Sequence, residues 1–241
     1  MSIVDIVVPF YNNVKTINFC LQSIFGQDFK DYSLILVNDG SSDGSLDMVN
    51  KFMSWLSDDE LKKIKIINQE NKGSNAARNR GAREGQAKYI IFCDADIKLH
   101  PKFLSKTIIF LEKNSNKSFC YTSFTYGWKK FKLWNFDILK LKQGPYIHTT
   151  SLILRKHFPG FDENIKRFQD WDLWLTMLEN GHTGIWLPEY LFKIMTRNGR
   201  ISNWLPKVLF EIPWDKIGFK PKNIKEYESA VKIIKTKHSL A

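Results

Sequence analysis

The sequence predicts an α/β fold with a mostly parallel central sheet, and three observations lead to this class. Apolar runs that fit buried strands alternate with segments of helical spacing through the first hundred residues. The chain has 241 residues, of which 43% are hydrophobic, and this is enough for a substantial core. A polar segment follows each apolar run, as expected where parallel strands end at a common edge. Strict alternation of strand and helix predicts a sheet with helices on both faces.

The elements of the first half can be placed in order. Ile3 to Phe10 is an apolar strand, and the segment after it repeats apolar residues at helical spacing until Gly26. The next helix follows the DGSSDGS segment, and a small-residue helix is expected over 74–87. Further strands are expected at Tyr32 to Asn38, Lys63 to Asn68 and Lys88 to Cys93.

Composition limits the classes of function. Three widely spaced cysteines suit buried thiols better than disulfides or zinc ligands. The N-terminal segment is expected to be a strand and not a signal peptide, and no apolar run approaches the length of a membrane span. The net charge of +11 predicts an acidic partner: a nucleic acid, an anionic membrane surface or a phosphorylated ligand.

Two carboxylates, Asp94 and Asp96, stand one residue apart where the fourth strand ends. Like charges this close repel each other unless a cation or solvent intervenes, and a solvated turn is the simpler explanation of the pair. The other strand-end segments contribute a carboxylate after strand two and arginines after strand three. Together these groups could hold a nucleotide diphosphate through Mg²⁺ or Mn²⁺, for which carboxylate oxygens are suitable ligands.

The ordered motifs PFYNN, VNDGSSDGS, ENKGSNAARNRG and FCDADI resemble the donor-binding half of family 2 glycosyltransferases of the GT-A fold. The resemblance runs from about residue 3 to about residue 203. It implies an inverting transferase whose donor is a nucleotide diphosphate sugar, usually UDP-linked. It also implies Asp96 as principal metal ligand with Asp94 near the ribose and metal, and Asp39 as hydrogen-bond partner of the base. The further donor-binding residues implied are Pro9, Tyr11, Asn71, Gly73 and Arg78.

The segment FDENIKRFQDWDLWLTMLENG resembles the part of the family in which a Glu-Asp pair opens a helix and the Asp is the general base. Here the pair is Gln169-Asp170, so Asp170 is the candidate base, although a helix-start role is the alternative. Trp171 is a candidate acceptor-binding residue, although such aromatics are more often core. Arg197 could steady the diphosphate, but Asn198 stands where the family often has a His.

The resemblance predicts one GT-A domain over residues 1–205, divided into a nucleotide-sugar half (1–100) and an acceptor half (101–205). Residues 206–241 form a basic tail. This tail and the aromatic, lysine-rich segment 127–142 could bind an anionic membrane surface. The expected setting is cytoplasmic, with a possible peripheral position on the membrane, and the expected acceptor is a glycan or lipid-linked acceptor in bacterial surface polysaccharide synthesis.

Two other functions fit parts of the sequence. GSSDG matches the nucleophile elbow G-x-S-x-G, with Ser42 as the nucleophile of an α/β hydrolase, but only one strand precedes it. Lysines and aromatic residues over 127–142 could also bind nucleic acid, through charge and base stacking. The ordered motifs favour nucleotide-sugar binding over this alternative.

Overall fold

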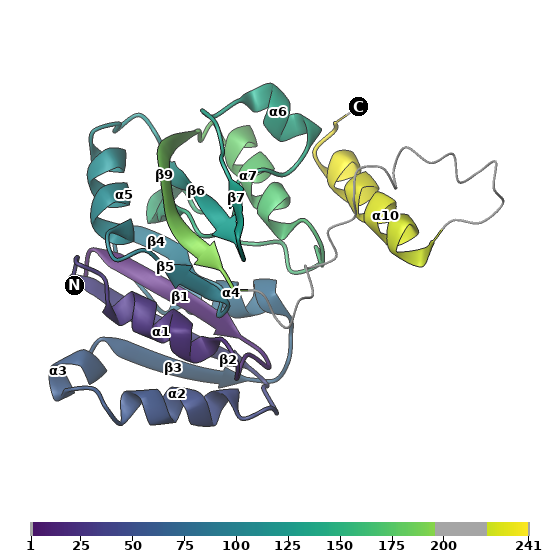
Figure 1. Ribbon diagram of the computed structural model, residues 1–241. Coiled ribbons are helices and arrows are strands. Elements are labelled where there is room, and N and C mark those ends of the chain that lie inside the picture. Colours follow the sequence, from purple (N-terminus) through teal and green to yellow (C-terminus); the bar gives the residue numbers. More distant parts are fainter. Residues whose placement is uncertain (1, 196–220, 241) are drawn as a thin grey trace. The chain divides into compact units, whose positions relative to one another are not determined.

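Residues 2–195 and 221–240 are described by the computed structural model, in which the first range forms a mixed sheet with helices on both faces (Figure 1). In the described part of the chain the sheet has nine strands in the order β3-β2-β1-β4-β8-β6-β9-β5, with β7 paired to β6. The strands are β1 (Val4–Phe10), β2 (Tyr32–Asp39), β3 (Ile64–Gln69), β4 (Tyr89–Phe92), β5 (Ile97–Leu99), β6 (Phe119–Tyr126), β7 (Lys129–Phe131), β8 (Leu152–Leu154) and β9 (Gly184–Ile194).

The helices lie on the two faces of this sheet. Alternate β1 residues, Ile6 and Val8 among them, join one core with α1, α2 and α5, whereas Val7 faces α4. On the side of α4, Trp174 of α7 stacks on Phe119 of β6 with centroids 4.4 Å apart. The helices are α1 (Ile17–Phe25), α2 (Ser45–Met53), α3 (Asp58–Leu61), α4 (Ser74–Arg83), α5 (Phe103–Glu112), α6 (Ile138–Gln143), α7 (Gln169–Glu179) and α10 (Lys222–Lys237), with a 3-10 turn at Arg155–His157.

The predicted parallel sheet is confirmed for the first half of the chain, where β3, β2, β1 and β4 pair in parallel. The helix expected over 74–87 ends earlier, at Arg83. The chain must turn there, because the Asp5 carboxylate accepts a hydrogen bond from the backbone of Ala87. Gly85 makes the approach possible, since a Cβ at this position would lie 2.2 Å from Asp5 Oδ2.

The two halves of the sheet are joined at β4 and β8, which are antiparallel. Arg155, directly after β8, donates through Nη2 to Asp5 Oδ2 of β1 at 2.5 Å. Its other nitrogens donate to the carbonyls of Ala82 and Ala87, each at 2.8 Å. This buried network holds β8 in place beside β4, so that residues preceding β8 lie beside those that follow β4.

The chain divides after Met195 into two compact units. The predicted boundary between domain and tail, at 205/206, lies outside the described residues. In the second unit the structure describes α10 and the residues next to it.

Candidate active site

The loops after β1 and β2 are tied together at the carboxyl edge of the sheet. Asn12 donates its N–H to Ser41 Oγ and accepts at Oδ1 from the Ser42 N–H at 2.9 Å. Asn13 N–H donates to Ser45 Oγ at 2.7 Å, and Val14 N–H donates to Asp43. Residues 41–45 therefore hold the loop that contains Tyr11, whose side chain is 46% exposed.

Asp39, at the end of β2, organises the loop between β3 and α4. Its carboxylate accepts from Gln69 Nε2 at 2.8 Å and from the N–H groups of Lys72 and Gly73, each at 2.9 Å. Gly73 has φ +90°, a conformation that glycine adopts without strain, and it directly precedes α4. Asp39 thus fixes Lys72 and Gly73 in the loop between β3 and α4, which also contains the exposed Asn71. Contact of Asp39 with a base stays a prediction.

Arg78, which is buried, forms an ion pair with the half-buried Asp94. Arg78 is 5% exposed, and its Nη2 donates to Asp94 Oδ1 at 2.7 Å. Burial works to raise the pKa of Asp94, but the charges of Arg78 and His148 and the hydrogen bond from Arg78 act together in the opposite direction, and the pKa is lowered. Arg78 Nε is buried and has no hydrogen-bond partner among the described residues. Such an atom is costly unless a water or a ligand group reaches it.

Helix α4 also positions the loop that leads into α7. Asn75 Nδ2 donates to the carbonyls of Asp162 and Ile165, at 2.8 and 3.1 Å. Asn79 exchanges two hydrogen bonds with the backbone of Phe161, each at 2.8 Å. The asparagines of the SNAARN segment therefore connect the predicted donor side to the predicted acceptor side, a role that sequence reasoning did not find. The pattern that could have predicted this role is the spacing of four between Asn75 and Asn79, which places both on one face of the helix.

Asp170 lies in the first turn of α7, and the charges of Arg78 and Asp94 both affect its pKa. Burial raises its pKa from 3.8 to about 6, although the Trp171 N–H and Arg78 act in the opposite direction. Gln169 Nε2 donates to Ser74 Oγ at 3.2 Å, so the start of α7 is linked to the start of α4. Asp170 therefore lies close enough to Arg78 and Asp94 for their charges to act on its pKa, and its role as a base stays a prediction.

Asp172 and Trp171, which follow Asp170 in α7, are more deeply buried than Asp170. Asp172 is 2% exposed, whereas Asp170 keeps partial exposure. Trp171 is 1% exposed, and its Nε1 donates to the Leu141 carbonyl of α6 at 2.6 Å. The expectation that Trp171 binds an acceptor is therefore not supported, because its ring and its only polar atom are used inside the core. Phe168, before the helix, has φ +61°, an unusual conformation for a bulky residue.

The two carboxylates at the end of β4 suit a divalent cation that is bound together with a diphosphate. Asp94 and Asp96 are both half-buried and offer hard oxygen ligands, and Asp94 keeps one carboxylate oxygen outside its bond to Arg78. Within residues 2–195 and 221–240, no group of three or more His, Cys, Asp or Glu side chains could hold a metal by itself. One or two carboxylates suit Mg²⁺ or Mn²⁺ when substrate phosphates complete the shell, so the donor set fits a metal brought with a diphosphate. Pro9 lies buried in β1, and Arg197 and Asn198 lie outside the described residues.

A family model for glycosyl transferase family 2 matches residues 5–170. The chain belongs to this family. EpsE of Bacillus subtilis (strain 168), named as a glycosyltransferase, is 29% identical over 205 residues, which cover 79% of this chain and 72% of EpsE. The teichoic acid poly(glycerol phosphate) polymerase of Staphylococcus epidermidis is 31% identical over 196 residues, covering 74% of this chain but only 26% of the polymerase.

Solved structures confirm the GT-A-like fold of this family 2 glycosyltransferase. S. aureus TarS 1-349 in complex with UDP-GlcNAc superimposes with a TM-score of 0.70 at 17% identity, covering 93% of this chain and 69% of that one. The mannosyltransferase PcManGT from Pyrobaculum calidifontis, in complex with GDP-Man and Mn²⁺, gives 0.69 at 16% identity, covering 96% and 69%. At these identities the likeness shows the fold alone.

His148 lies near Asp94 and Arg78, and sequence reasoning gave it no role. It precedes β8, and its ring lies against Phe124 and Phe192, with centroids 5.8 and 5.2 Å away. Asp94 and Arg78 both act on its charge. The sequence carried no signal for it, because its neighbours in space come from β4, β6 and β9, and no histidine or acid stands at metal-ligand spacing beside it.

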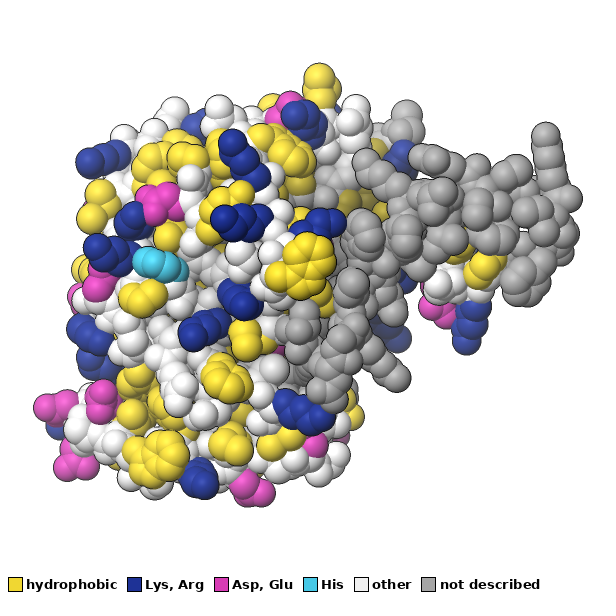
Figure 2. Space-filling view, viewed as in Figure 1, with side chains coloured by type: hydrophobic (Ala, Val, Ile, Leu, Met, Phe, Trp, Pro, Cys, Tyr) yellow, Lys and Arg dark blue, Asp and Glu magenta, His cyan; other side chains and the backbone are white. Residues whose placement is uncertain are grey.

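The basic aromatic segment 127–142 folds into the tip of the β6–β7 hairpin, β7 and α6. Trp128 is 94% exposed and Leu139 is 71% exposed. Lys129 lies over Phe131 and Lys140 over Trp134, at 5.2 and 4.8 Å. Figure 2 shows Lys and Arg side chains interleaved with hydrophobic ones on this face of the molecule. A mixed surface of this kind is compatible with a membrane interface.

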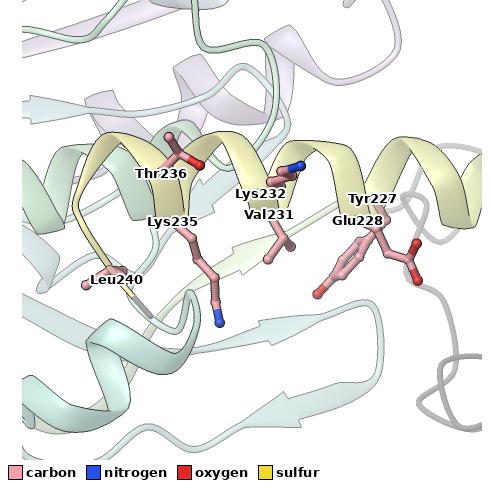
Figure 3. A pocket seen from close by; sticks show the side chains of 7 residues that line it. All are labelled: Tyr227, Glu228, Val231, Lys232, Lys235, Thr236 and Leu240. Atoms are coloured by element: carbon pink, nitrogen blue, oxygen red, sulfur yellow. The ribbon is translucent and has the colours of Figure 1, made fainter.

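The described part of the tail, α10, contains Lys at several positions and two buried residues, Ile224 and Ile234. Its pocket is lined by Tyr227, Glu228, Val231, Lys232, Lys235, Thr236 and Leu240 (Figure 3). The Tyr227, Val231 and Lys235 side chains project from the same side of the helix, as their spacing of four predicts. No described helix is long and apolar enough to cross a membrane.

Proposed function

We propose that this chain is an inverting glycosyltransferase that transfers a sugar from a nucleotide diphosphate sugar, with UDP expected, to a hydroxyl group of a glycan or lipid-linked acceptor. One observation carries the proposal. Asp170, whose pKa is about 6, shares a partly buried site with Asp94 and Arg78 at the edge where the donor-binding loops converge. A base, an anchored carboxylate and a cation are the groups that such a transfer needs.

Asp170 acts as the general base in this proposal. With a pKa of about 6 it is mostly ionised at neutral pH, yet basic enough to accept a proton. Its carboxylate takes the proton from the acceptor hydroxyl while that oxygen attacks the anomeric carbon from the side opposite the diphosphate. The bond to the diphosphate breaks with its electron pair, and the configuration inverts.

Other residues of the site bind and orient the donor. Arg78 fixes one oxygen of Asp94 through its Nη2. Asp96 and Asp94 would hold Mg²⁺ or Mn²⁺, which when bound neutralises charge on the diphosphate. Tyr11, Asn71 and Gly73 would contact the nucleotide.

The setting is part of the same proposal. TarS has been crystallised with UDP and with UDP-GlcNAc, which supports a UDP-linked donor. The similarity to a teichoic acid polymerase and to EpsE supports a role in bacterial surface polysaccharide synthesis. We place the enzyme in the cytoplasm, with Trp128, Leu139 and the neighbouring lysines as a peripheral membrane surface.

The test is release of nucleotide diphosphate from a panel of UDP-sugars, because slow hydrolysis of the donor needs no known acceptor. Asp170→Asn is expected to bind UDP normally and to lose turnover about a hundredfold or more. Asp172→Asn, two residues along the same helix, removes the same charge and is the comparison; because Asp172 is buried, urea unfolding must first show that this variant is folded. Turnover that survives in the Asp170 variant and is lost in the Asp172 variant would move the base to Asp172.

A further inference from the structure

His148 is brought into the site by strand pairing. β8 runs antiparallel to β4 with Ile153 opposite Ile90, so the residues before β8 lie alongside those after β4, where Asp94 stands. The imidazole is held against Phe124 of β6 and Phe192 of β9. These contacts limit rotation of the ring, which therefore presents its polar atoms in a defined direction.

The hydrogen bonds of His148 determine which nitrogen can donate. The Thr150 N–H donates to His148 Nδ1 at 3.0 Å, so Nδ1 is an acceptor and carries no proton. In a neutral ring the proton is then on Nε2. Burial lowers the pKa of His148 to about 4, and Arg78 adds to this against the opposing effect of Asp94. At neutral pH the ring is therefore an uncharged N–H donor with a fixed tautomer.

The order of the strands indicates which part of a nucleotide sugar would lie near the Nε2–H group of His148. The loops that contain Tyr11, Asp39 and Gly73 follow β1, β2 and β3, which lie on one side of β4. His148 lies on the other side, toward β8 and β6. A nucleotide sugar runs from base through ribose and diphosphate to the sugar. If the nucleotide covers β1 to β3 and the diphosphate reaches Asp94, the sugar extends toward His148.

We propose that His148 donates its Nε2–H to a hydroxyl group of the transferred sugar and so contributes to donor selection. This inference rests on the proposed function, because it needs a nucleotide sugar in the site. A buried donor that is built to meet a hydroxyl disfavours sugars that leave it unpaired, and this gives specificity out of proportion to one hydrogen bond. The residue binds substrate and takes no proton in the reaction.

Two substitutions separate this role from a structural one. His148→Gln places an amide N–H near the position of Nε2 but has no good acceptor for Thr150. His148→Asn keeps an acceptor near the position of Nδ1 but lacks the Nε2 donor. A structural role predicts that Asn is tolerated better than Gln, whereas the proposed role predicts the reverse order.

The assay uses UDP-glucose, UDP-galactose and UDP-N-acetylglucosamine, and follows the one that the wild-type protein hydrolyses fastest in Mn²⁺, with UDP as competitive inhibitor. We expect His148→Asn to lower kcat/KM about tenfold or more while the inhibition constant of UDP stays within about twofold, and His148→Gln to keep most of the activity. Normal kcat/KM in the Asn variant, or a parallel loss of UDP affinity, would overturn the inference. A wild-type protein that does not bind UDP would instead overturn the proposed function, and this inference with it.

Discussion

Replacement of Asp170 by Asn should change how the stability of the protein depends on pH. The pKa of Asp170 is raised from 3.8 to about 6 by burial, which its hydrogen bond to Trp171 and the charge of Arg78 offset only in part. Between these two pH values the folded protein holds a proton that the unfolded chain has released. Asp170 therefore contributes stability that is fully present below pH 3.8 and is lost as the pH rises through about 6. A shift of two pKa units corresponds to about 3 kcal/mol.

The assay is urea unfolding followed by tryptophan fluorescence, for wild type and Asp170→Asn, at intervals from about pH 4 to about pH 7. Subtracting the two curves removes every titrating group that they share. Relative to the variant, the wild type should be about 2.4 kcal/mol less stable at the upper end than at the lower end, because at pH 4 the unfolded chain has already begun to take up the proton. A difference that does not change with pH would show that the pKa of Asp170 is not raised in the folded protein.

His148→Asn should show the opposite sign in the same assay. The pKa of His148 is lowered from 6.5 to about 4 by burial, so the unfolded chain takes up a proton first as the pH falls. The stability contributed by the neutral ring is present above pH 6.5 and is lost as the pH falls to about 4. As the pH falls, the free energy of unfolding of the wild type should rise relative to Asp170→Asn and fall relative to His148→Asn. A general effect of acid on the fold would not give two differences of opposite sign.

Two further predictions concern packing and the surface. Gly81→Ala should lower the free energy of unfolding by about 1–3 kcal/mol, because its Cβ would lie 2.4 Å from Val7 Cγ1. Urea unfolding measures this change. Unchanged stability would show that α4 can move away from the sheet. The protein should co-sediment with anionic liposomes and be released by salt. Trp128→Ala, or truncation after Pro221, should weaken this binding without changing the affinity for UDP. Equal recovery on neutral and anionic liposomes would contradict a membrane-binding surface.

The first half of the fold could be predicted from local pattern. β1, β2, β3 and β4 are short apolar runs separated by helices, and in such a chain the handedness and order of neighbouring strands follow general rules. The ends of these strands therefore had to converge, and the groups placed there, Asp94 and Arg78, do meet. Periodicity predicted the parallel strands, whereas the family resemblance implied the donor-binding roles of Asp94 and Arg78.

The second half depends on pairing between distant segments. β9 lies between β6 and β5, and β8 lies between β4 and β6, arrangements that no local repeat encodes. For this reason His148 could not be placed near Asp94 from the sequence. Trp171 was misjudged for a related reason: helical spacing shows which residues share a face, but not that this face is covered by α6.

The measurement that tests the account most directly is the melting temperature with UDP in the presence of Mn²⁺ or of EDTA. If Asp96 and Asp94 bind a cation together with a diphosphate, saturating UDP should raise the melting temperature by about 5 °C more with Mn²⁺ than with EDTA. Asp96→Asn should abolish this difference. Asp59→Asn, which removes an equal charge from an exposed position of α3, should keep it. A metal-dependent shift that persists in the Asp96 variant, or no shift in the wild type, would contradict a nucleotide diphosphate site at the end of β4.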